Sequence, residues 1–158
     1  FYDFRGCCGP RKQSVGVEGE RNTLIFIDIL PAAWTASQCA GLLTMGGVWL
    51  TLAREGDQCV GFALARHIGA EAELLLLAVS RAAQGRGIGR MLLDRFERDA
   101  KTRGADRLHL EVRDGNHAVN LYEESGFTLV GRRKNYYKGA DGYCYDALTL
   151  AKGAHGRS

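Results

Sequence analysis

The stretch of chain between residues 73 and 103 limits the possible folds more than any other. It opens with Glu73–Val79, an apolar run of strand length whose lack of alternation is typical of a strand buried on both faces. A loop with alternating glycines follows. Beyond the loop, apolar residues recur at helical spacing, at Ile88, Met91, Leu92 and Phe96. The stretch therefore predicts a buried strand, a tight turn and an amphipathic helix over Gly89–Arg103, which is a unit of α/β folds.

The residues before this unit predict a meander of strands. Val48–Arg54 and Gln58–Ala65 are strand-like and are joined by the turn Glu55-Gly56-Asp57. We therefore expect a hairpin that continues into the buried strand. Earlier in the chain, Thr23–Ile29 is β-branched and apolar enough for a strand, and Trp34–Leu43 is typical of a helix.

The residues after the amphipathic helix predict a second half of the sheet. Arg107–Val112 alternates between polar and apolar residues, as a strand with one buried face does. Asn116 can cap a helix that ends near Ser125, and Phe127–Tyr136 and Tyr143–Leu150 are typical of a closing pair of strands. The order β-β-β-α-β-α-β-β predicts an α/β sandwich with a mixed sheet.

Length and composition indicate one domain. The chain has 158 residues and 17.3 kDa, with 46% hydrophobic and 25% charged residues, which suits a single core of ordinary composition. We expect this domain to span residues 23–152. An irregular N-terminal segment, residues 1–22, and a mobile tail, residues 153–158, are expected on either side of it.

The charge and hydropathy of the chain limit the classes of partner that it is expected to bind. The net charge of +3 and the pI of about 8.7 suit a phosphorylated cofactor but are weak grounds for nucleic acid, so we expect no direct nucleic-acid binding. The densest apolar stretch, Leu74–Val79, is far too short to span a bilayer, and the sequence does not open with a signal segment. We therefore expect a cytoplasmic protein without a membrane partner.

The cysteines and histidines predict neither a metal site nor a disulfide framework. The five cysteines are odd in number and show no C-x-x-C spacing, which fits neither a zinc site nor paired disulfides. The four histidines also lack the spacing of metal ligands. We expect no metal.

The loop Gln84–Arg90 predicts an anion site. Its glycines let the backbone turn tightly and approach a ligand, and the unpaired amides of the following helix add positive potential there. Arg86 and Arg90 contribute full charges. The loop lacks the Lys-Ser/Thr pair of a P-loop, and its alternating glycines do not fit the dinucleotide fingerprint. The competing interpretation is a glycine-rich turn that only reverses the chain.

The motif Gln84-x-x-Gly87-x-Gly89 resembles that of the GNAT N-acetyltransferases. The resemblance implies a mixed, mostly antiparallel sheet flanked by helices, and acetyl-CoA as co-substrate. In that family the loop binds the pyrophosphate, the preceding strand end binds the pantetheine arm, and an amide there, here that of Val79, polarises the thioester carbonyl. The cofactor-binding residues implied are Leu77, Ala78, Val79, Gln84, Gly85, Arg86, Gly87, Ile88, Gly89, Arg90 and Asn116.

Three further segments look like RimI-type enzymes, which acetylate protein N-termini. They are Leu110-Glu111-Val112-Arg113, Leu121-Tyr122-Glu123-x-x-Gly126-Phe127 and Arg132-Arg133-x-Asn135-Tyr136-Tyr137. This resemblance implies direct acetyl transfer in a ternary complex to the N-terminal alanine of a small-subunit ribosomal protein. One alternative is an enzyme of the same family that acts on a small-molecule amine or a lysine side chain. Another is a non-catalytic ribosome- or nucleic-acid-binding module, which would leave the glycine loop unexplained.

Glu111 and Tyr122 are the catalytic residues that the resemblance implies. Glu111 would be the general base that takes a proton from the attacking amine, and Tyr122 the general acid that protonates the CoA thiolate. From the sequence alone, a solvated or ion-paired carboxylate is the more common role of an isolated glutamate such as Glu111. Tyr122 could equally be a core tyrosine with a bonded hydroxyl.

The remaining candidates have two interpretations each. Asn116 is a helix cap or, by resemblance, a cofactor contact; six steps separate it from Tyr122, where the family usually has seven. Tyr136 and Tyr137 resemble tyrosines that line the peptide channel, but aromatic residues also pack on sheets without a further role. Trp34 resembles an aromatic residue that shapes the acceptor site.

Overall fold

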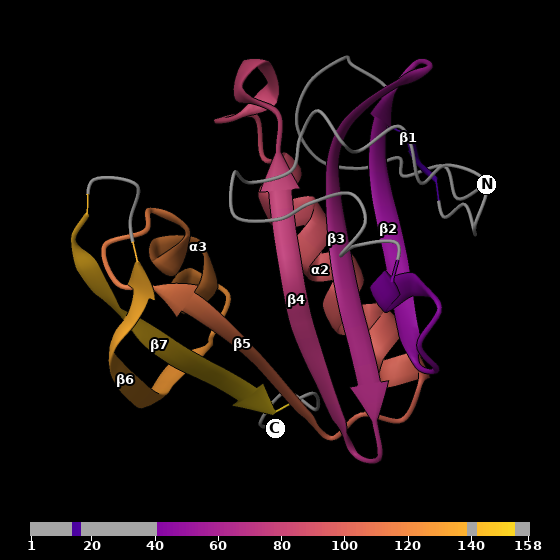
Figure 1. The fold of residues 1–158 in the computed structure, drawn as a ribbon. Coiled ribbons are helices and arrows are strands. Elements are labelled where there is room, and N and C mark those ends of the chain that lie inside the picture. The colour runs from indigo at the N-terminus through magenta and orange to yellow at the C-terminus, as the bar shows by residue number, and fades with distance from the viewer. Residues whose placement is uncertain (1–13, 17–40, 139–141, 154–158) are drawn as a thin grey trace.

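Figure 1 shows the fold in a computed structural model, which describes residues 14–16, 41–138 and 142–153. Their seven strands form one sheet in the order β1-β2-β3-β4-β5-β7-β6. Every neighbouring pair is antiparallel except β4 and β5, which are parallel. The predicted α/β domain with a mixed, mostly antiparallel sheet is therefore confirmed.

The predicted elements agree with the structure to within a few residues. The elements are β1 (Ser14–Gly16), β2 (Val48–Glu55), β3 (Gln58–Ile68), β4 (Glu71–Val79), the 3-10 helix η2 (Arg81–Ala83), α2 (Ile88–Thr102), β5 (Arg107–Arg113), α3 (Ala118–Glu124), β6 (Thr128–Lys138) and β7 (Cys144–Gly153). The strand predicted at Thr23–Ile29 and most of the helix predicted at Trp34–Leu43 lie outside the described residues. Residues 41–43 are helical.

Strand β1 departs from the irregular segment predicted for residues 1–22. Ser14 lies opposite Arg54 and Gly16 opposite Leu52, so the segment adds an antiparallel strand to the edge of β2. Three residues without hydrophobic periodicity carry no strand signal of their own. These residues form a strand because they pair with β2, which lies far away in the sequence. The local pattern of residues cannot reveal such pairing.

Helix α2 covers one face of the sheet and forms the core with it (Figure 1). Of the residues that predicted the helix, Ile88, Leu92 and Phe96 are buried. Met91 is partly buried against the same core. The Phe96 ring stacks on Trp49 of β2 with 6.1 Å between the ring centroids. Burial of the predicted apolar stripe thus explains why this segment is helical and where it lies.

Strand β4 contains a bulge that moves its side chains between faces. Leu74 lies opposite Ala65 of β3 while Leu76 lies opposite Leu64, so Leu75 is an extra residue. Beyond the bulge, Leu77 packs against the α2-side core and Leu76 against a second apolar cluster on the other face. The unbroken apolar run therefore packs on both faces, as predicted.

The same strand marks the point where the sheet forks. Parallel pairing between β4 and β5 ends at Leu74 opposite Leu110. From there β5 continues beside β7, with Glu111 opposite Thr149, while β4 continues beside β3. Figure 1 shows the two strands diverging beyond this point. One edge of β4 after the bulge is thus left without a strand partner among the described residues.

Lys152 ties β7 to both helices and gives a test of the packing. Its Nζ donates to Glu97 Oε2 of α2 at 2.7 Å and to the Ser125 carbonyl at 2.6 Å, and the other Glu97 oxygen is enclosed and has no hydrogen-bond partner among the described residues. We expect Lys152→Met to lower the free energy of unfolding by about 1–3 kcal/mol, because it leaves Glu97 unpaired. Chemical denaturation measures this. Lys101→Met, at an exposed site of α2, is the matched control and should cost less than about 0.5 kcal/mol.

In the described part of the chain, no helix combines the length and the apolar character needed to cross a bilayer.

Candidate active site

The loop before α2 leaves the N-terminus of the helix open to a ligand. Gly85 and Gly87 have φ of 72° and 81°, in the left-handed region that favours glycine. Gly87 is the N-cap and offers no side chain, and the first intrahelical bond runs from the Met91 amide to the Gly87 carbonyl at 3.0 Å. The amides of residues 88–90 therefore precede the helical hydrogen-bond ladder. No acidic residue lies in the first turn.

The polar side chains of the loop have unequal surroundings. The Gln84 side-chain amide donates to the Val79 carbonyl at 3.1 Å and so braces the loop against the end of β4. Arg86 contacts both carboxylate oxygens of Glu55 on β2, so its charge is already compensated. Within the described ranges, the one contact of the Arg90 guanidinium is an exposed ion pair with Asp94 at 3.4 Å. Of the two arginines that the sequence places at the anion site, Arg90 is the more available.

The free edge of β4 presents backbone groups to the fork. The Ser80 amide donates to the Val60 carbonyl at 2.9 Å, across the pairing with β3. Backbone groups alternate in direction along a strand, so those of Val79 and Leu77 point to the opposite edge. The groups of Ala78 point toward β3. Among the three predicted strand-end residues, Leu77 and Val79 therefore offer hydrogen bonds at the fork.

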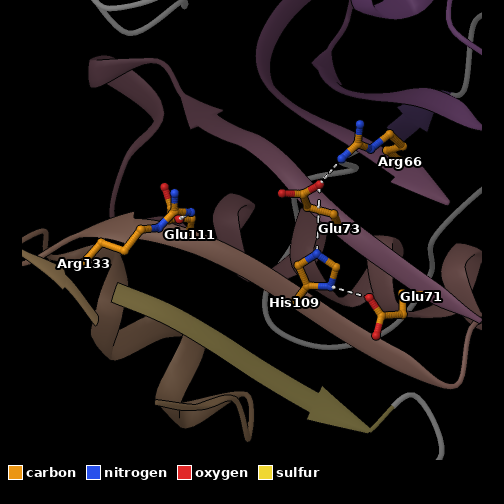
Figure 2. Close-up of polar contacts among 6 residues, drawn as sticks. All are labelled: Arg66, Glu71, Glu73, His109, Glu111 and Arg133. Carbon is orange, nitrogen blue, oxygen red and sulfur yellow. Dashed lines mark hydrogen bonds and ion pairs between the residues drawn. The ribbon is translucent and has the colours of Figure 1, made fainter. Parts of the chain in front are cut away.

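Glu111 is the first residue of β5 beyond its last pair with β4. Its side chain is 20% exposed, and the alternation of β5 puts it on the face opposite the α2-side core. Figure 2 shows the Arg133 guanidinium of β6 against its carboxylate. The Tyr137 hydroxyl donates to Glu111 Oε1 at 3.4 Å. The structure thus brings the predicted base to the fork and joins it to β6.

The two predicted substrate-site tyrosines pack beside this carboxylate. The Tyr136 and Tyr137 rings meet edge to face with 5.1 Å between centroids. Burial, and after it the nearby Glu111 carboxylate, raises the pKa of Tyr137 to about 12. Tyr136 is 52% exposed, and the Arg133 guanidinium lies 4.4 Å over its ring. Tyr136 therefore offers an accessible aromatic surface next to Glu111.

Charged side chains continue along the same face of the sheet (Figure 2). Glu73 accepts a hydrogen bond from Arg66 at 2.7 Å. His109 lies 4.0 Å from Glu71 and 4.0 Å from Glu73. The contacts of Glu71 and Glu73 come from side chains of β3 and β5, whereas those of Glu111 come from β6.

Tyr122 of α3 lies on the face of the sheet opposite to Glu111, in the core that α2 also lines. The residue is only 6% exposed, packs edge to face on Phe127 at 6.2 Å, and burial raises its pKa to about 12. The structure therefore places Tyr122 in the core, and its hydroxyl has no hydrogen-bond partner among the described residues.

Asn116 directly precedes His117, the N-cap of α3, and its side chain caps the start of the helix as predicted. Its Oδ1 accepts a hydrogen bond from the Ala118 amide at 2.9 Å, which leaves its NH2 group available for other contacts. Trp34 lies outside the described residues.

The two described cysteines, Cys59 and Cys144, differ in their exposure. Burial raises the pKa of the Cys59 thiol, which donates to the Gly61 carbonyl at 3.5 Å, while Cys144 is exposed. No group of three or more His, Cys, Asp or Glu side chains in residues 14–16, 41–138 and 142–153 could hold a metal ion.

Sequence reasoning missed the residues that shape β6 near Glu111. Asn135 has φ of 54°, and its amide donates to Asp146 Oδ1 of β7 at 3.0 Å. Arg132 donates to Asp146 at 2.9 Å and to Asp114 at 2.7 Å. The Asn135 amide, and then Arg132, hold the pKa of Asp146 below its usual range. Arg132 and Asn135 belong to a segment that carries the RimI resemblance, and that was the only signal in the sequence.

Residues 23–127 of the chain match the acetyltransferase (GNAT) family. The chain belongs to this family. The match confirms the predicted class of enzyme, an acetyl-CoA-dependent N-acetyltransferase, over a non-catalytic binding module.

Relatives within the family carry the name [ribosomal protein bS18]-alanine N-acetyltransferase. The protein of Salmonella typhimurium is 38% identical over 133 residues, which cover 77% of this chain and 89% of that protein. The protein of Haemophilus influenzae is 39% identical over 97 residues, 61% of this chain and 66% of its own length, just under two thirds. The crystal structure of the Escherichia coli ribosomal-protein-S18-alanine N-acetyltransferase has a TM-score of 0.83 at 26% identity, covering 92% and 96% of the two chains. The resemblance to RimI-type enzymes is confirmed.

Proposed function

We propose that this chain transfers the acetyl group of acetyl-CoA to the N-terminal alanine of ribosomal protein bS18. The names of its relatives suggest this acceptor. The observation that carries the proposal is the position of Glu111, which lies at the fork of the sheet beside the Tyr136 and Tyr137 rings. An acceptor of this kind implies a cytoplasmic enzyme.

Acetyl-CoA would bind along the free edge of β4 and the start of α2. The amides of residues 88–90 and the Arg90 charge suit the pyrophosphate, because both present positive potential at an uncapped helix end. The backbone of Leu77 would pair with the pantetheine arm. The Val79 amide would donate to the thioester carbonyl, since its own carbonyl is taken by Gln84.

The reaction would proceed by direct attack in a ternary complex. The acceptor nitrogen bonds to the thioester carbonyl carbon, and its proton passes to Glu111, directly or through water. The tetrahedral intermediate then breaks the C–S bond. Tyr122 gives its proton to the departing thiolate, a thiol with an ordinary pKa of about 8.5. Solvent then returns a proton to the phenolate, and Glu111 releases to solvent the proton that it took from the amine. Glu111 and Tyr122 lie on opposite faces of β5, so acid and base would act from two sides of the fork.

An α-amine is the easier acceptor for this arrangement. Its pKa of about 7.7–8.0 leaves a fair fraction neutral near pH 7.5, whereas a lysine amine near 10.4 is almost wholly protonated. The alternative acceptors remain a lysine side chain and a small-molecule amine.

Peptide acetylation tests the proposal. The full chain would be mixed with acetyl-CoA and a peptide of the bS18 N-terminus that begins with alanine, and CoA release would be followed. We expect turnover of this peptide, but none of the same peptide with its α-amine blocked. Faster turnover of a lysine in the blocked peptide, or of a polyamine, would assign the enzyme to another acceptor. If no amine is acetylated and acetyl-CoA does not raise the melting temperature, the proposal is wrong.

The glycine at the N-cap of α2 gives a test of the donor site. A methyl group on Gly87 meets no atom within 4 Å, so Gly87→Ala acts through its left-handed backbone, at about 1–2 kcal/mol. We expect the variant to shift the loop and raise the KM for acetyl-CoA roughly tenfold, the loss of about 1.4 kcal/mol of binding. Gly69→Ala is the matched control: it has φ of 60° and equal space in the turn after β3, and should lose stability without any change in this KM.

A further inference from the structure

The Glu111 carboxylate is held by β6, and the proposed function leaves this contact unexplained. Arg133 reaches one carboxylate oxygen, Oε2, and the Tyr137 hydroxyl reaches the other, Oε1. Arg133 is 58% exposed, so its side chain could extend freely into water. A long exposed side chain keeps one geometry only when other contacts hold it there.

A bulge in β6 places both contacts on one face. Arg133 lies opposite Ala147 and Tyr137 lies opposite Tyr145, so four steps along β6 match two steps along β7. The two extra residues are accommodated by the left-handed conformation of Asn135. The hydrogen bond from its amide to Asp146 fixes this bulge to β7. Arg133 and Tyr137 therefore face Glu111 together.

Aromatic contacts then fix the orientation of the guanidinium. The Arg133 guanidinium lies over the Tyr136 ring, with 4.4 Å between its Cζ atom and the ring centroid. The Tyr136 ring in turn packs edge to face on Tyr137. Arg133, Tyr136, Tyr137 and Glu111 thus form a closed ring of contacts. A planar guanidinium that rests on a ring can donate to a carboxylate from a defined direction, which a lysine ammonium cannot do as well.

We propose that Arg133 is a positioning residue for acetyl transfer, which holds the Glu111 carboxylate at the fork through Oε2. The inference rests on the proposed role of Glu111 as the base. A carboxylate has about four lone-pair sites, so a single contact from Arg133 and a long one from Tyr137 leave sites for the proton of the amine. Arg133 therefore orients the Glu111 carboxylate and still leaves it able to accept the proton of the amine.

Removal of the guanidinium tests the inference. We expect Arg133→Gln to lower kcat for the bS18 peptide roughly 10- to 100-fold, since a misplacement of about 1 Å can cost on the order of 10²-fold. The KM for acetyl-CoA and the melting temperature should stay unchanged, because Arg133 is exposed and lies on β6, away from α2. Arg133→Lys should recover part of the rate. Lys134→Gln, which removes the neighbouring exposed charge of β6, is the matched control and should keep the wild-type kcat.

A double variant shows whether Arg133 acts through Glu111. If it does, Arg133→Gln should add no further loss of kcat in a Glu111→Gln background. Losses that multiply, or an Arg133→Gln enzyme with normal kcat and a lower KM for the peptide, would overturn the inference; the latter would mean that Arg133 only occupies the place of the acceptor amine. A Glu111→Gln enzyme with normal kcat would instead refute the role of Glu111 in the proposed function.

Discussion

Glu111→Gln should lower kcat for the bS18 peptide by about 10²- to 10⁴-fold, the usual contribution of a positioned general base. Glutamine keeps the size of the side chain and can still contact Arg133 through its carbonyl oxygen, but it cannot accept the proton of the amine. The KM for acetyl-CoA should change little, because the proposed phosphate site at the start of α2 does not involve this side chain. Steady-state CoA release at varied concentrations of both substrates separates the two effects.

Glu71→Gln is the matched control for this substitution. Glu71 lies on the same face of the sheet, beside His109 and 3.6 Å from Arg107, but at the paired end of β4 and β5. Its loss removes the same charge from the same surface and should leave kcat within about twofold. Equal losses in both variants would show that the face acts only through its overall charge, and Glu111 would no longer be the base.

Periodicity was enough to predict where the main elements lie and which way they face. The alternation of Leu108, Leu110 and Val112 places Glu111 on the polar face of β5, and the structure has it there. The stripe that includes Leu92 and Phe96 likewise predicts the buried side of α2. These predictions are correct because the periodicity of apolar residues within one helix or strand is enough to determine which of its faces is buried.

The pairing between strands that lie far apart in the chain could not be predicted from the sequence. The position of the fork depends on where the pairing of β4 with β5 ends, and the β6 bulge depends on the register of β6 against β7. A register depends on both strands, so the residues of one strand do not determine it. The arginines illustrate the consequence. The sequence predicts Arg86 at the anion site, but in the structure its charge is compensated by an ion pair with Glu55, 31 residues away. The sequence assigned no role to Arg133, although Arg133 contacts the predicted base.

Tyr122→Phe should lower kcat by roughly 10²-fold, because the CoA thiolate would leave without a proton donor. The fold should not suffer. The phenyl ring can keep its packing on Phe127, and the lost hydroxyl has no partner among the described residues, so the melting temperature should stay equal or rise slightly. The KM values for both substrates should change little. Tyr143→Phe, at a side chain 70% exposed, is the control and should match the wild type.

The pH dependence of the wild type gives an independent test of Tyr122. Burial raises its pKa from 10.0 to about 12, so the phenol stays protonated, and able to donate, through the whole range in which the acceptor amine becomes neutral. The rate should therefore rise as the pH passes the amine pKa of about 8 and should not fall near pH 10, where an ordinary tyrosine would lose its proton. A decline centred near pH 10 that is absent from Tyr122→Phe would mean that the phenol titrates as if exposed. A Tyr122→Phe enzyme with the wild-type rate would remove Tyr122 from the mechanism and leave water at the fork as the proton donor.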